Sequence, residues 1–112
     1  MQPIVEKVDD VAVVTVPLDE LEISSVDEFK LQLTGIMEES KKLVLDMTRV
    51  NFVDSSGCGV IIFCLKRLEE SGGGLKLCGV SRPVATVLKM IRLHRICDIL
   101  NTREEAVAAF KS

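Results

Sequence analysis

The 112-residue chain has no tryptophan, no tyrosine and a single histidine, His94. Its only aromatic residues are four phenylalanines, and its formal net charge is −3. The sequence therefore lacks the basic stripe interleaved with aromatic residues that is typical of nucleic-acid-binding surfaces. A zinc site is equally disfavoured, because His94 has no neighbour at a ligand spacing.

Cysteine pairs and long hydrophobic runs are also missing. The four cysteines, Cys58, Cys64, Cys78 and Cys97, form no CxxC motif and lie in or beside apolar segments, so we expect buried, reduced thiols. No apolar run reaches the roughly 18 residues that span a bilayer, and residues 1–7 carry no signal-peptide pattern. These features predict a cytoplasmic protein, and the length predicts one domain over residues 1–112.

The N-terminal third predicts a β-hairpin followed by a loop and a helix. Residues 3–8 and 11–16 are rich in β-branched residues and are joined by a short polar turn, which predicts an antiparallel pair. Residues 18–24 read as an acidic loop. Ser24 or Ser25 then starts a helix, and Ser25 and Glu28 have the spacing of a capping box.

From residue 25 onward, helical and strand patterns alternate up to a terminal helix that Asn101 or Thr102 would cap. Such alternation favours parallel strands joined by right-handed crossovers. The sequence thus predicts an α/β fold. It should have a central, mixed but mostly parallel sheet of four or five strands, packed with about four helices. The N-terminal hairpin strand should be antiparallel.

The central segment, residues 43–60, joins a buried strand to a strongly apolar helix through a polar turn. Val50, Phe52 and Val53 should anchor the approach to the turn in the core. The turn consists of Asp54, Ser55, Ser56 and Gly57, residue types that satisfy the free N–H groups at a helix start. The segment therefore predicts a helix cap, with the helix following the turn.

Several catalytic or ligand-binding interpretations find little support. A serine hydrolase needs a base held by an acid, and nothing in the sequence places His94 near Ser55. Residues 72–76 resemble a phosphate loop only superficially, because the glycines follow a helix and precede a strand. The carboxylates of Asp19, Glu20 and Glu22 could bind a divalent ion, but a solvated acidic loop, or one that contacts a partner, is the simpler interpretation.

The order of elements, and above all residues 43–47 and 50–60 with their Asp-Ser-Ser-Gly-Cys-Gly-Val core, resembles the STAS domain of bacterial anti-sigma factor antagonists. The resemblance covers essentially the whole chain and implies the STAS fold over residues 1–112. Residues 19–22 depart from the family pattern Gly-Glu-hydrophobic-Asp, because they lack the glycine and end in Glu22 rather than Asp. Pro17 is also unusual there, so the partner-facing loop is expected to differ.

The resemblance implies a phosphorylation switch. In the family, a partner that is both anti-sigma factor and serine kinase phosphorylates the first serine of the turn, here Ser55. The unphosphorylated antagonist binds that partner and releases the sigma factor, and a serine phosphatase resets the switch. Partner contacts are implied for Asp54, Ser55, Ser56, Gly57, Glu20 and Glu22.

By the same resemblance the chain is not an enzyme and needs no cofactor, because ATP and magnesium belong to the kinase. Two alternatives stay open on the sequence alone. The chain could be a STAS subunit with another output, such as a stress-sensing assembly or a lipid-transport accessory. It could also be a small nucleotide-binding protein that uses the Ser55 turn.

Overall fold

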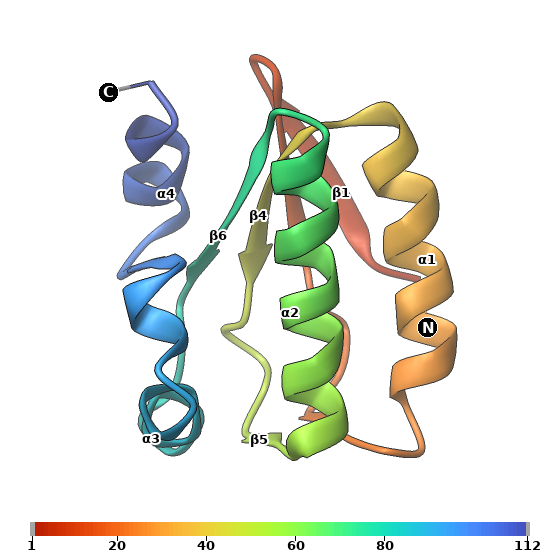
Figure 1. Ribbon diagram of the computed structural model, residues 1–112, viewed down its shortest axis with the longest axis vertical. Helices are drawn as coiled ribbons and strands as arrows, with labels where there is room; N and C mark the ends of the chain where they lie inside the picture. Colours follow the sequence, from red (N-terminus) through yellow and green to blue (C-terminus); the bar gives the residue numbers. More distant parts are fainter. Residues whose placement is uncertain (1, 112) are drawn as a thin grey trace.

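The computed structural model describes residues 2–111, and its centre is a five-stranded sheet of order β1-β2-β4-β6-β7 (Figure 1). β1 pairs antiparallel with β2, and every other neighbouring pair in this sheet is parallel. The predicted mixed, mostly parallel sheet is therefore confirmed. Its strands are β1 (Ile4–Val8), β2 (Val11–Thr15), β4 (Lys42–Asp46), β6 (Gly74–Cys78) and β7 (Asp98–Leu100).

Helices cover both faces of this sheet, and the side chains of β2 alternate between them. Ala12 and Val14 pack into the large core with α1 (Val26–Glu39), α2 (Ser55–Glu70) and α3 (Arg82–Met90). Val11 and Val13 point to the other face, where Ala106 and Val107 of α4 (Arg103–Ala109) cover them. Figure 1 shows α1 and α2 side by side, and a 3₁₀ turn, η1 (Leu93–Arg95), follows α3. No helix within residues 2–111 is long and apolar enough to cross a membrane.

Two local predictions near the central segment are wrong. The predicted loop at 18–24 contains a short strand, β3 (Glu20–Leu21), which pairs in parallel with β5 (Phe52–Val53). Val50 and Val53 are buried as expected, but the side chain of Phe52 is 50% exposed. Successive residues of a strand face opposite sides, so burial of Val53 turns Phe52 outward.

The helix starts also differ from the sequence expectation. α2 begins at Ser55, so Ser55, Ser56 and Gly57 form its first turn rather than a separate turn before it. Ser25 is the N-cap of α1, but its hydroxyl donates to the carbonyl oxygens of Glu20 and Glu22 and makes no capping box. A capping box forms instead at α4, between Thr102 and Glu105.

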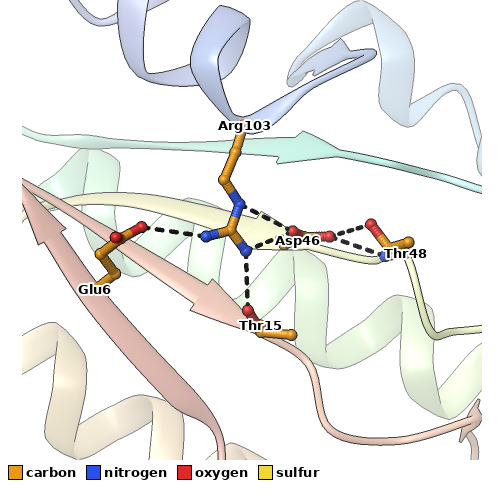
Figure 2. Close-up of polar contacts among 5 residues, drawn as sticks. All are labelled: Glu6, Thr15, Asp46, Thr48 and Arg103. Atoms are coloured by element: carbon orange, nitrogen blue, oxygen red, sulfur yellow. Dashed lines mark hydrogen bonds and ion pairs between the residues drawn. The ribbon is translucent and has the colours of Figure 1, made fainter.

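A single arginine at the start of α4 ties that helix to three strands (Figure 2). Its guanidinium donates to Asp46 of β4 through Nη2 at 2.7 Å and Nε at 3.2 Å. The same group reaches Thr15 Oγ1 on β2 at 3.0 Å and Glu6 Oε1 on β1 at 3.1 Å. Thr48 donates to Asp46 from its backbone N–H and its hydroxyl. This role of Arg103 could not be predicted from the sequence, because its partners lie far away along the chain.

The Asp46–Arg103 pair is electrostatically favourable in the folded state. Burial alone would raise the pKa of the Asp46 carboxyl, but the hydrogen bonds from Thr48 and Arg103 outweigh it and lower the pKa below its ordinary value. The Asp46 carboxylate correspondingly raises the pKa of Arg103. Asp46 is thus a buried, charged and fully bonded anchor for α4.

Candidate functional site

Asp54 organises the start of α2 with both of its carboxylate oxygens. Oδ1 accepts a hydrogen bond from the backbone N–H of Gly57 at 2.9 Å, which caps the helix. Oδ2 accepts from the backbone N–H of Ile23 at 3.1 Å, in the loop that precedes α1. One side chain therefore holds the first turn of α2 and the 22–25 loop in a fixed relation.

Ser55 follows this cap and is exposed, whereas Ser56 is half-buried. Within residues 2–111, no hydrogen bond engages the Ser55 hydroxyl, so it is free to react or to accept a contact. The N–H groups of the first turn and the helix dipole favour negative charge at this position. The site can therefore present an unmodified serine or accommodate an anion on it.

Gly57 permits the close approach of α2 to β3. A Cβ atom at this position would lie 2.2 Å from the carbonyl oxygen of Leu21 and 2.8 Å from a methyl group of Val53. No real Cβ tolerates such distances, so the backbone of Gly57 can pack there only without a side chain. Gly57 is buried, so it determines the packing of the turn and does not lie on its surface.

The β3–β5 pair brings the acidic loop beside the serine turn. Glu20 lies opposite Phe52 in the ladder, and the backbone N–H of Asp54 donates to the carbonyl oxygen of Leu21 at 3.3 Å. Glu20 is exposed, and Glu22 accepts hydrogen bonds from the N–H and hydroxyl of Ser24. The residues for which the family resemblance implies partner contacts thus lie on neighbouring segments of one end of the molecule.

Two exposed apolar side chains border this site, and the sequence reasoning missed both. Ile23 is 69% exposed in the loop held by Asp54, and Phe52 is 50% exposed on β5. β5 has only two residues, so its alternation of outward and inward side chains cannot be detected in the sequence. For this reason the sequence wrongly predicts that Phe52 is buried. Exposed apolar residues beside acidic ones are typical of protein-binding surfaces.

The chemistry available inside the chain is limited. Burial raises the pKa of the Cys64 and Cys97 thiols to about 12 and that of Cys78 to about 11, so these groups stay protonated. Burial, followed by the nearby Asp54 carboxylate, also raises the pKa of Cys58. His94 is exposed in η1 and makes no hydrogen bond with Ser55. Among the described residues, no three acidic, cysteine or histidine side chains are grouped to hold a metal ion.

Comparison with known proteins places this geometry in a family. The STAS domain profile matches residues 2–106, which is nearly the whole chain. The chain belongs to the STAS domain family. The predicted resemblance to this family is thus confirmed, and the five-stranded sheet with its four helices is a STAS fold.

Relatives of this STAS chain include named regulators of sigma factors. The anti-sigma F factor antagonist of Paenibacillus polymyxa is 30% identical over 90 residues, covering 79% of this chain and 77% of the relative. The crystal structure of tm1081 from Thermotoga maritima is 30% identical with a TM-score of 0.91, covering 98% of this chain and 95% of that one. The phosphorylated form of the Bacillus cell fate determinant SpoIIAA shares the fold, with a TM-score of 0.72, 22% identity and coverage of 96% and 97%.

Proposed function

We propose that this STAS protein is an anti-sigma factor antagonist that is switched by phosphorylation of Ser55. In the unphosphorylated state it binds an anti-sigma factor that is also a serine kinase, and the sigma factor is released. A serine phosphatase restores the binding state. The chain itself performs no catalysis and uses no cofactor, and it acts in the cytoplasm, where a sigma factor and its inhibitor meet.

The observation that carries the proposal is the free, exposed hydroxyl of Ser55 at the start of α2. Within the described residues, no side chain is hydrogen-bonded to the Ser55 hydroxyl to activate it as a nucleophile, and both oxygens of the adjacent Asp54 accept from backbone N–H groups. An external kinase needs only access to the hydroxyl. Glu20, Glu22, Asp54 and Ser56 stand beside it on segments joined by the β3–β5 pair and the Asp54 hydrogen bonds. The proposed docking surface consists of these residues, with Gly57 shaping the turn beneath them.

Phosphorylation should leave the fold almost unchanged. A phosphoserine carries about −1.5 to −2 charges at neutral pH, and the N–H groups at a helix start favour such a charge. SpoIIAA, which has this fold, has been solved in a phosphorylated form. The effect of the phosphate should fall on the interface, where its charge adds to that of Asp54 and its bulk separates two packed surfaces.

The test is phosphate transfer to the purified chain. Incubation with its cognate kinase and radiolabelled ATP should label the parent and Ser56→Ala to the same extent and should not label Ser55→Ala. Ser55→Ala should still bind the kinase, since it keeps the surface without the acceptor. Labelling of Ser55→Ala would move the site to another residue, and absence of both labelling and binding in the parent would refute the switch.

A further inference from the structure

The segment that follows α2 is strongly basic. Residues 71–97 contain five lysines and arginines and no aspartate or glutamate, in a chain whose net charge is −3. Three of these cations, Lys89, Arg92 and Arg95, fall within residues 89–96, which we call the α3–η1 corner. None of the three forms an ion pair with another residue in the described part of the chain.

Apolar side chains are exposed among these cations. Met90 is 77% exposed, Ile96 is 60% exposed and Ile91 is 42% exposed. Leu93, by contrast, is 1% exposed and is the one residue of the corner that points into the core. The other seven residues of 89–96 face solvent, so the corner combines three apolar and three basic side chains with His94.

The backbone of the corner is compact and well defined. The N–H of Arg92 donates to Lys89 at 3.0 Å, that of Arg95 to Arg92 at 3.2 Å, and that of Ile96 to Leu93 at 3.0 Å. Arg92 adopts a left-handed conformation with φ of 60°, a conformation that is unfavourable for a residue with a side chain. The apolar and basic side chains are therefore displayed by a tight double turn in which an arginine occupies a position that suits glycine.

We propose that the α3–η1 corner binds the surface of a bilayer that contains anionic lipids. Exposed apolar side chains enter the boundary between headgroups and acyl chains, while adjacent cations contact the anionic headgroups. The charges are complementary, because residues 71–97 contain no carboxylate, and Asp98, which follows them, is paired with Lys76 at 2.7 Å. Glu69 of α2, which lines a hollow with Ile96, is the carboxylate beside the edge of the corner. The mobile headgroups of a bilayer can also gather around closely spaced cations. A protein partner would instead have to place a carboxylate opposite each cation. This inference is independent of the role of Ser55.

The first test is sedimentation of the full chain with vesicles. It should bind vesicles of equal parts phosphatidylcholine and phosphatidylglycerol, should not bind phosphatidylcholine alone, and should dissociate at high salt. Arg92→Gln/Arg95→Gln should bind roughly thirtyfold more weakly, given about 1 kcal/mol per cation at an anionic surface. Lys41→Gln/Lys66→Gln removes two exposed cations elsewhere and should bind like the parent.

The absence of tryptophan allows a second test of which residues meet the lipid. In a Met90→Trp variant the fluorescence should shift to the blue on addition of the anionic vesicles. Leu31→Trp is a matched control, because Leu31 is 75% exposed on α1, and its fluorescence should not shift. Both variants should keep the circular dichroism and melting temperature of the parent, since each replaces an exposed residue.

Three outcomes would overturn the proposal. Equal binding to neutral and anionic vesicles would remove the role of the cations, and equal blue shifts at Met90 and Leu31 would remove the role of the corner. The third is failure of the full chain to bind the anionic vesicles at low salt. If Arg92→Gln/Arg95→Gln then weakens a complex with a protein, the corner is a protein contact instead.

Discussion

Two aspartates that lie close together in the chain have opposite roles in the structure. Asp46, at the end of β4, accepts hydrogen bonds from Arg103 and Thr48, and its side chain is 11% exposed. Asp54, before α2, accepts only from backbone N–H groups, and its neighbour Ser55 is exposed. The first carboxylate is committed to holding α4 on the sheet. The second holds two surface segments in place and leaves the serine between them free.

Changes at Arg103 should therefore affect stability most. Arg103→Leu leaves the Asp46 charge buried without its partner. Breaking this pair should lower the free energy of unfolding by about 2 to 3 kcal/mol. This value is below that for a fully buried pair, because the Arg103 side chain is 34% exposed and solvent screens its charge. Urea unfolding followed by circular dichroism measures this change.

A matched control exists beyond the opposite end of the same helix. Lys111 and Asp9 form an exposed ion pair, so Lys111→Gln should leave the urea midpoint unchanged. If Arg103→Leu and Lys111→Gln unfold at the same urea concentration, the Asp46–Arg103 network is not the anchor of α4.

Gly57→Ala should give the next largest effect, at the serine site itself. Its Cβ would meet the Leu21 carbonyl oxygen and Val53, so β3 must move, at a cost of about 2 kcal/mol. Gly59→Ala on the same helix meets nothing within 4 Å and should instead stabilise the protein by up to about 1 kcal/mol. Thermal unfolding of the two variants distinguishes tight packing at Gly57 from a general effect of glycine in helices.

Asp54→Ala removes the α2 cap and should cost about 1 kcal/mol. Asp54→Asn supplies a single acceptor oxygen and can satisfy the N–H of Gly57 or of Ile23, but not both. We expect the Ile23 amide to exchange with solvent faster in the Asn variant, while the melting temperature falls less than in the Ala variant. Unchanged exchange at Ile23 would show that Asp54 does not hold the 22–25 loop.

The pH dependence of stability should report Asp46. Because its pKa is lower in the folded than in the unfolded state, its contribution is fully present above its unfolded pKa of about 4. The contribution is lost as the pH falls from there through the lower folded pKa. The difference in melting temperature between the parent and Asp46→Asn should therefore shrink below about pH 4. A difference that stays constant into acid would contradict the lowered pKa.

The elements that could be predicted from the sequence are those with a clear hydrophobic periodicity over neighbouring residues. Alternating helical and strand patterns from residue 25 onward were sufficient for the parallel sheet, and the Asp-Ser-Ser-Gly core was sufficient for the family. Prediction from the sequence failed where structure depends on distant contacts. β3 exists because Glu20 and Leu21 pair with β5, and Ser25 loses its capping box because its hydroxyl bonds to the preceding loop.

The same distinction applies to the functional surfaces. The position of Ser55 at the start of a helix could be anticipated from capping preferences alone. The hydrogen bond from Ile23 to Asp54, the outward turn of Phe52 and the reach of Arg103 across three strands could not, because each joins segments far apart in the chain. The phosphorylation of Ser55 stays a prediction from the family resemblance and the exposed geometry.

The smallest expected effect on stability, and the largest on binding, should occur at Ser55. Ser55→Asp introduces a charge that the α2 dipole favours, so the melting temperature should stay the same or rise slightly. Ser55→Asn has almost the same shape without the charge and is the matched control. The two variants thus separate the role of charge from that of size.

The most direct test is the affinity of these two variants for the cognate anti-sigma factor, measured by calorimetry. Ser55→Asn should bind nearly as well as the parent, and Ser55→Asp should bind about a hundredfold more weakly, equivalent to roughly 3 kcal/mol. Equal affinities for the two variants, or weak binding of Ser55→Asp that merely follows a loss of folded protein, would contradict a charge switch at Ser55.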